Sequence, residues 1–400
     1  MYVLIATTLA GLFQSCINDN YPIEDPATDD NSVYLVLHIG LATPTRASNL
    51  SNELMHTLRI VLLDENGEIE YNKRVEDLGN GVSEYGYHII STKTGKKKIY
   101  LIANEGCVDR VNGVNGGTQS LTDWLNKLTK ENANDLDNVY FTPSLHGAEQ
   151  NIPISAYYEF EITEEELKAS NSRQAKRDFD LVYAATKFEI RFENYLNTSV
   201  TINNLSISSV ADDMYLFAHF DKGNNETTLL KTMPEAQGGG SWIEWLKEVS
   251  EETTAKPNLP DNEDINNAYD WLTDYVLPTN THNELAIITQ STGNNNTIGQ
   301  INGNTPGTLS FTNLYTTESK YIPQGGTEQK YTLDVTLTSN GNNGNTQTKK
   351  FESQEIPNLR TLFRNTHAII TMSIRQNLQN LQIAYTVCPW DEKSTDITFK

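Results

Sequence analysis

Large apolar residues alternate with other residues near the N-terminus of the chain, which is the pattern of a half-buried β-strand. Between them stand Tyr34, Val36 and His38, which belong to the opposite face of such a strand. Because successive side chains point to opposite faces of a strand, the apolar set forms one continuous face that must be covered. That set is Val33, Leu35, Leu37 and Ile39.

The same spacing recurs near the C-terminus, over residues 381–387. Pro389 ends this run, residues 391–394 are typical of a turn, and a last short strand follows. A strand with one apolar face must either pair within its own sheet or be offered to another molecule. The apolar side chains of the two segments are Leu381, Ile383, Tyr385, Val387, Ile397 and Phe399.

Between the two ends, short apolar runs alternate with polar connections that are rich in Asn, Gly and Thr. Leu121, Trp124 and Leu125 recur at helical spacing, which predicts a short helix packed on a core. Residues 163–177 are charged and are interpreted as a linker. The fold class is therefore all-β with small helical insertions. Further strands are predicted over 57–63, 85–90, 99–104, 152–162, 181–192, 200–208 and 331–337.

Charge and length narrow the class of protein. The 400 residues carry a net charge of −22, which argues against nucleic acid or an anionic lipid surface as a partner. Single cores stop growing near about 250–300 residues, so the chain is long enough for two domains. We place these domains at 33–172 and 173–400. The three lysines at 96–98 are interpreted as a solvated hairpin rather than as a binding patch.

The first residues resemble an export signal. Residues 3–13 are apolar but too few to span a bilayer, which takes roughly 20 residues. They lead to Ser15-Cys16 and then to an acidic stretch, an order similar to that of bacterial lipoprotein signals. We therefore interpret 1–15 as a signal peptide and 16–32 as an acidic linker that begins with the lipidated Cys16. A plain secretory signal is the alternative.

No pattern of catalytic or metal-binding residues stands out. The seven histidines are dispersed, and the HExxH, GxSxG, P-loop and Rossmann patterns are absent. Cys107 and Cys388 lie far apart without a CxxC pair, so no zinc site is predicted, while a bond between them stays open. The acidic residues at 261–270 lack EF-hand spacing and are interpreted as solvated surface. We expect no enzyme activity, no cofactor and no metal.

A polar loop at 43–49 follows the first strand and contains Arg46, a reasonable site for proteolysis after arginine. This loop and Cys16 belong to a series of features whose order resembles that of the Bacteroidales fimbrillins. These are the type V pilins, which include major and minor fimbrial subunits and their Mfa-like relatives. The chain departs from the commoner family residues at Ala368 and at 154–156. The other features in the series are 95–104, Ile152-Pro153-Ile154, 185–190, Arg364-Asn365-Thr366-His367 and 387–391.

The resemblance implies two tandem transthyretin-like Greek-key β-sandwich domains and export to the outer membrane as a lipoprotein. It also implies removal of the first strand (within 33–46) by cleavage between Arg46 and Ala47. Strand exchange would then join the chain to other fimbrial subunits, of the same or another kind, in a surface fimbrium that supports adhesion and biofilm formation. The donor strands would lie within 381–399.

Two alternatives stay open. In the first, the chain is an anchor or tip subunit of the same fibre. In the second, it is a surface lipoprotein that does not polymerise and that binds a glycan or a host protein through its loops. Trp242, Trp245 and Trp271 are then candidates for stacking on sugar rings, although packing in a core is the simpler explanation.

Overall fold

The computed structural model describes residues 32–42, 50–75, 78–112, 114, 119–141, 151–170, 173–211, 213–223, 226–229, 282–288, 296–320, 331–340, 345–356, 361–362, 364–376 and 378–389. The predictions for Cys16, Arg46, Ala47, Ile397 and Phe399 lie outside these residues, as do those for the tryptophans at 242, 245 and 271. Within the described ranges, no helix has the length and apolar character needed to cross a membrane.

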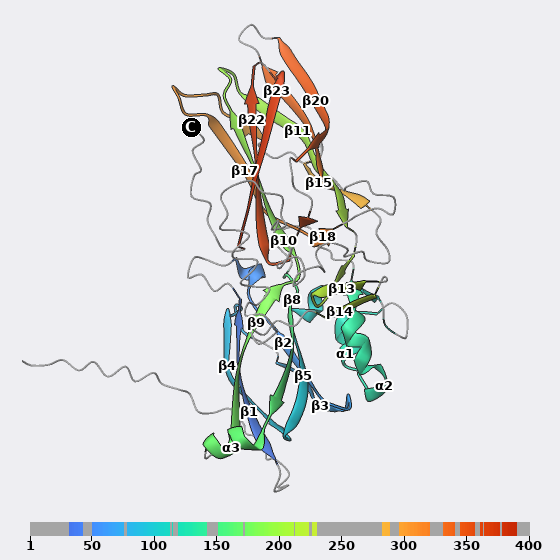
Figure 1. Ribbon diagram of the computed structural model, residues 1–400. Coiled ribbons are helices and arrows are strands. Elements are labelled where there is room, and N and C mark those ends of the chain that lie inside the picture. Colours follow the sequence, from blue (N-terminus) through green and yellow to red (C-terminus); the bar gives the residue numbers. More distant parts are fainter. Residues whose placement is uncertain are drawn as a thin grey trace, which may run out of the picture.

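Seven strands form the first large sheet, in the order β3-β2-β5-β8-β9-β1-β4 (Figure 1). β8 and β9 share only two residue pairs, Ile154–Tyr183 and Ser155–Val182, so the sheet divides there into two layers. One core holds inward side chains of both layers, which makes this half a β-sandwich. The strands are β1 (Val33–Leu41), β2 (Leu58–Asp64), β3 (Ile69–Val75), β4 (Glu84–Thr92), β5 (Gly95–Ala103), β8 (Ile154–Ile162) and β9 (Gln174–Tyr183).

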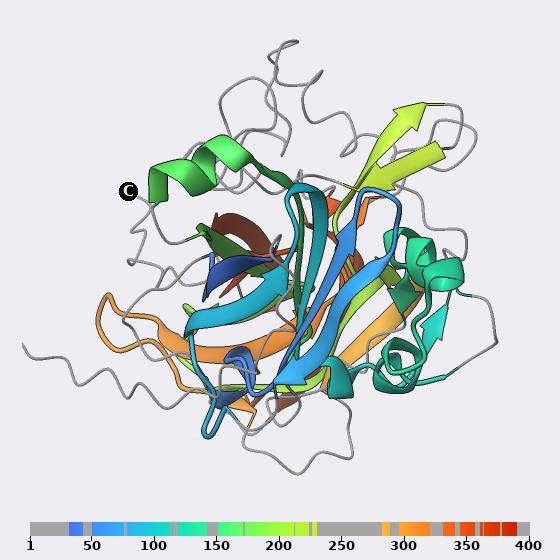
Figure 2. The ribbon, with the colours of Figure 1, turned by 90° about the horizontal axis from the view of Figure 1, so that it is seen from below.

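Short helices lie against the outside of the first sandwich (Figure 2). Ser120 caps α1 by accepting a hydrogen bond from the backbone N–H of Asp123 at 3.1 Å. Trp124 packs with Val61 and Ile102 in a separate apolar cluster, which confirms the predicted short helix and its packing role. The helices are η1 (Ser51–Glu53), η2 (Glu105–Cys107), α1 (Leu121–Leu125), α2 (Lys130–Ala133), η3 (Asn134–Asn138) and α3 (Glu164–Ser170).

The second sandwich contains two sheets, ordered β17-β10-β22-β23 and β15-β11-β19-β20, with β16 paired to β11. Its core joins Phe188 and Ile370 of the first sheet to Leu205 and Val335 of the second. The strands are β10 (Thr186–Asn194), β11 (Val200–Ala211), β15 (His282–Ile288), β16 (Thr297–Ile298), β17 (Gly307–Thr316), β19 (Thr332–Asn340), β20 (Thr346–Glu355), β22 (Thr366–Arg375) and β23 (Asn380–Pro389).

Three small sheets complete the described part of the chain. The first has the order β12-β7-β6, and the others are the pairs β13-β14 and β18-β21. Their strands are β6 (Val111–Asn112), β7 (Tyr140–Phe141), β12 (Met214–Tyr215), β13 (His219–Gly223), β14 (Glu226–Leu229), β18 (Ser319–Lys320) and β21 (Thr361–Leu362).

Buried polar contacts join the two sandwiches. Glu53, which is 2% exposed, accepts Lys187 Nζ at 2.7 Å and the Tyr315 hydroxyl at 2.9 Å. Arg364 is fully buried and donates from Nε to Glu318 Oε1 at 2.9 Å. Its Nη1 donates to the carbonyl oxygen of Leu216 at 3.0 Å. Buried charges are costly unless they are paired, so these contacts hold the two halves at a defined junction.

The all-β fold with small helices is confirmed, whereas several predicted boundaries differ from the structure. The predicted boundary at 172/173 separates strands that share a sheet, because β9 pairs with both β1 and β8. The run 181–192, predicted as one strand, divides between β9 and β10. The predicted linker at 163–177 contains α3 and the start of β9. For β9 and β10, partners far away in the sequence (β1 and β22) determine the pairing.

The three lysines at 96–98 do not form a solvated hairpin. They lie within β5, and Lys97 is only 3% exposed. Its ammonium group donates to Glu70 Oε1 at 2.8 Å, and this pairing offsets the cost of burying the charge. Cys107 has a free thiol whose Sγ donates to the carbonyl oxygen of Asn104 at 2.8 Å. Burial raises the pKa of this thiol.

Candidate strand-exchange site

Strand β1 lies inside the first sheet, with a neighbour on each side. Residues Tyr34–Leu41 run parallel to β9, in register with Gln174–Leu181. On the other side β1 runs antiparallel to β4, from the pair Val33–Thr92 to the pair Gly40–Glu84. The first strand of the described chain is therefore held by two backbone ladders.

The inward face of β1 is the apolar face that the alternation predicts. Its side chains pack with Ile60, Leu101 and Phe179 in the core of the first sandwich. Alternation also extends one step further than predicted, to Leu41 at the end of the strand. Val33, Leu35, Leu37 and Ile39 are each 0% exposed, and Leu41 is 1% exposed.

Strand β4 forms the far wall of this site. It stands at the end of the sheet, and within the described chain its only strand partner there is β1. Without β1, both β9 and β4 would therefore present unpaired backbone groups along an apolar groove. Sequence reasoning missed these two walls, because alternation within a strand carries no information about which other strand lies beside it.

The segment that follows β1 leads toward the predicted cleavage site. The backbone N–H of Ala42 donates to the carbonyl oxygen of Leu181 at 2.8 Å, so the β9 side of the ladder continues to the end of the strand. Arg46 and Ala47 follow within five residues of Ala42, outside the described residues. Leu50 lies directly before the short helix η1.

The segment predicted as a donor forms β23 at the edge of the second sandwich. It pairs antiparallel with β22 from Thr366–Pro389 to Arg375–Asn380. Leu381, Ile383 and Tyr385 are half-buried and pack against the second core. The backbone of Val387 pairs with Ala368. The sequence left open whether this strand pairs within its own sheet or is offered to another molecule. In the structure it pairs within its own sheet.

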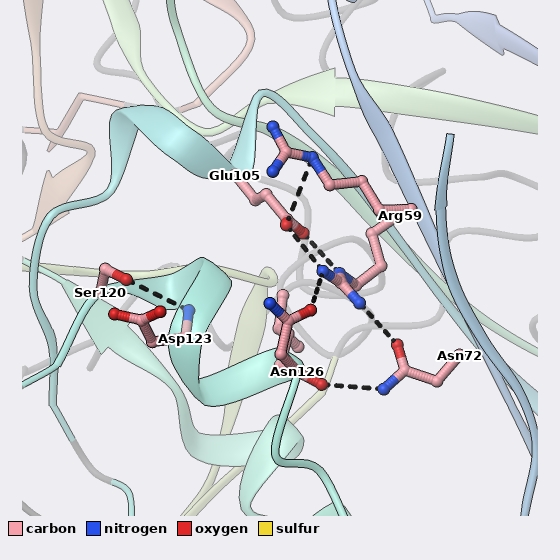
Figure 3. A network of polar contacts seen from close by, with 8 residues as sticks. Arg59, Asn72, Glu105, Ser120, Asp123 and Asn126 are labelled. Carbon is pink, nitrogen blue, oxygen red and sulfur yellow. Dashed lines mark hydrogen bonds and ion pairs between the residues drawn. The ribbon is translucent and has the colours of Figure 1, made fainter. Parts of the chain in front are cut away.

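A charged network elsewhere in the first sandwich fastens helix to sheet (Figure 3). Arg59 on β2 donates to Glu105 through Nε at 2.6 Å and Nη2 at 2.8 Å. The same guanidinium donates to Asn72 on β3 and to Asn126, which follows α1. Arg59 is 3% exposed and Glu105 0% exposed, so this pair is shielded from solvent. The network stabilises the position of α1 on the sheet.

Comparisons with known proteins find similarity at the level of solved structures. No protein-family profile and no curated protein sequence matches the chain. The solved structures similar to it include the C-terminally truncated tip fimbrial protein Mfa3 of Porphyromonas gingivalis. The identity is 12% and the TM-score 0.46, over 90% of this chain and 100% of that one.

Two further structures show a similarity of the same kind. A fimbrilin, FimA, of Porphyromonas gingivalis W83 is 12% identical, with a TM-score of 0.44, over 90% of this chain and 98% of that one. A putative cell adhesion protein of Bacteroides eggerthii is 14% identical, with a TM-score of 0.47, over 90% of this chain and 96% of that one. All three come from Bacteroidales, the order whose fimbrillins the sequence resembles.

Proposed function

We propose that this protein is a fimbrial subunit that is joined to neighbouring subunits by β-strand exchange at the bacterial surface. The observation that carries the proposal is the position of β1. This strand is the first in the described chain, it fills a slot between β9 and β4, and it ends five residues before Arg46. One cut at Arg46 would end the covalent link between β1 and the rest of the domain.

In the proposed pathway the chain is exported as a lipoprotein with an acylated Cys16, and a protease then cuts between Arg46 and Ala47. Loss of β1 removes five buried side chains, whose burial contributes about 8–15 kcal/mol gross. The empty slot is therefore an unstable state until another strand with the same apolar spacing enters it. Strand addition by a second subunit restores both the ladders and the core.

The ladder geometry favours donation of a C-terminal strand. Among the described strands, β23 pairs with β22 alone, whereas a strand in the β1 slot pairs with β9 on one side and with β4 on the other. A strand that moves from the β23 position into the β1 slot of a second subunit would gain a second backbone ladder. Its half-buried side chains would take the place of fully buried ones. The donor residues would be Leu381, Ile383, Tyr385 and Val387 of β23, or Ile397 and Phe399 of the segment that follows it.

Mass spectrometry of the intact chain, taken from the surface of its own cells, tests this proposal. A start at Ala47 is expected, because it means that β1 has been removed. A start at an acylated Cys16 would contradict processing at Arg46. The same sample, separated by size without boiling, should show ladders of subunits if the strands have been exchanged.

A second candidate function is favoured by the position of β23. Because this strand already completes its own sheet, the chain would also suit a subunit that does not donate, such as an anchor or tip. A non-polymerising surface lipoprotein that binds a glycan or host protein is the related possibility. An enzymatic role is not proposed, and the described residues contain no group of three or more His, Cys, Asp or Glu able to hold a metal.

A further inference from the structure

The two edge strands of the first sheet, β3 and β4, are connected to each other by side chains. They stand at opposite ends of the strand order and share no ladder within the described chain. Because the sheet divides into facing layers, these ends nevertheless come together. His88 lies on β4, and its Nε2 is 2.7 Å from the hydroxyl oxygen of Tyr71 on β3. Its Nδ1 is 3.3 Å from the hydroxyl oxygen of Tyr85, which lies on β4 as well.

A second bridge links the same two strands nearer the end of β4. The Thr92 hydroxyl donates to Glu70 Oε2 at 2.6 Å, and the buried Lys97 ammonium donates to Glu70 Oε1 at 2.8 Å. Thr92 is 5% exposed, so water competes little for this contact. The two bridges are Tyr71–His88 and Glu70–Thr92, and the Tyr85 hydroxyl supports the first from within β4. We call these contacts together the β3–β4 clasp.

Resting on the function proposed above, we propose that the β3–β4 clasp holds β4 in place when β1 is absent. It thereby keeps the groove open for an incoming strand of a second subunit. Tyr71, Tyr85 and His88 are thus positioning residues of the acceptor, because they act on the partner strand only through β4.

The remaining supports of β4 show why a clasp is needed. At its start, Met55 and Val82 exchange two backbone hydrogen bonds, each of 3.0 Å. At its end, a two-residue connection leads from Thr92 directly into β5. Between these two points the backbone of β4 is paired with β1 alone among the described strands. Removal of β1 leaves the middle of β4 held by Ile90 in the core and by the clasp.

The chemistry of His88 suits this role. Burial, with a contribution from Lys73, lowers the pKa of His88, so the imidazole is neutral at neutral pH. A neutral ring has one donor and one acceptor nitrogen, and a tyrosine hydroxyl serves either. The clasp is therefore satisfied without a buried charge on the ring. Its rings also pack, with the Tyr71 and His88 centroids 5.6 Å apart.

The test uses the full chain with a site-specific protease sequence in place of residues 43–49. After cleavage, β1 is displaced in mild denaturant and the protein is returned to buffer. A fluorescent peptide of residues 33–42 is the probe, and hydrogen exchange reports on 84–92. The clasp variant is Tyr71→Phe with Tyr85→Phe, which keeps both rings and removes both hydroxyls.

A matched control removes two hydroxyls elsewhere. Tyr157→Phe with Tyr195→Phe has the same chemistry, but these hydroxyls donate to Glu159 and Glu193. Tyr157 belongs to the separate apolar cluster that contains Trp124, and not to the clasp. A single Tyr71→Phe variant serves where the double clasp variant folds poorly, and should show a smaller effect of the same sign.

Before cleavage, all variants should protect 84–92 as the wild type does, because the ladder with β1 holds β4. After loss of β1, the clasp variant should exchange roughly tenfold faster in this segment and should bind the probe roughly tenfold more slowly, with the control unchanged. Equal exchange in the clasp variant and the wild type would overturn the inference. So would a wild-type β4 that exchanges freely after β1 has left.

The experiment distinguishes failure of the clasp from failure of the proposed strand exchange. The probe is the protein's own first strand, so its return does not depend on donation by a second subunit. A competing peptide of residues 380–399 tests that step. If the clasp results hold but this peptide does not displace the probe, C-terminal donation fails while the clasp stands.

Discussion

Strands β1 and β23 have nearly the same apolar spacing but very different surroundings. β1 pairs on both sides and buries its inward side chains completely. β23 has a single partner among the described strands and leaves Leu381 and Ile383 half-exposed to solvent. Release of β1 breaks two ladders and opens a core, while release of β23 breaks one ladder. The same apolar spacing is therefore held much more firmly in β1 than in β23.

The largest expected effect comes from blocking the proposed cut. Arg46→Gln should leave β1 attached, so that the surface protein begins at Cys16 and forms no subunit ladders. Arg46→Lys is the control that retains the charge but not the recognition by an arginine-specific protease, and it should behave as Arg46→Gln does. Polymers formed by either variant would mean that β1 need not be removed.

A second test compares the two strands by core truncation. Leu37→Ala in β1 should lower the free energy of unfolding by about 2–5 kcal/mol, because the side chain is fully buried. Ile383→Ala in β23 should cost about 1–2 kcal/mol, since that side chain is half-buried. Urea unfolding measured on the uncleaved chain provides both values. Equal losses would remove the energetic distinction between the two strands.

A third test locates the donor within 381–399. Ile397→Asp with Phe399→Asp should abolish subunit ladders, with little change in the free energy of unfolding, if the last segment enters the groove. Leu381→Asp with Ile383→Asp should abolish them only together with a loss of about 1–3 kcal/mol, because these residues also pack on the second core. Intact ladders in both variants would exclude the C-terminal segment as the donor.

The smallest expected effect is the contribution of His88, on β4, to the pH dependence of stability. Since the pKa of His88 is lowered in the folded protein, the unfolded chain takes up its proton first as pH falls below about 6.5. His88 therefore contributes stability that is present above pH 6.5 and is lost as pH falls through the folded pKa. Urea midpoints between pH 7 and pH 5 should fall less steeply in His88→Asn than in the wild type.

His219 provides the background for that measurement. Its burial lowers its pKa to about 4, so it weakens the fold in the same direction as pH falls, and it remains in the His88→Asn variant. The difference between the two slopes therefore reports His88 alone. Identical slopes would show that His88 takes no part in the pH dependence.

Local patterns in the sequence determined which faces of the strands are buried. The alternation over 33–39 predicted a single apolar face, and all four side chains are fully buried. The spacing of Leu121, Trp124 and Leu125 predicted α1 and its packing. These predictions succeed because the period of the side chains is a property of one segment by itself.

Only the tertiary structure decided which segments lie beside one another. It placed β9 next to β1, made the lysine run part of β5 with Lys97 buried, and paired β23 with β22 in its own sheet. Backbone ladders look alike whatever their partner, so alternation cannot choose between partners far apart in the chain. The sequence thus determined that β1 must be covered, and the packing of the two layers decided that the slot which covers it lies between β9 and β4.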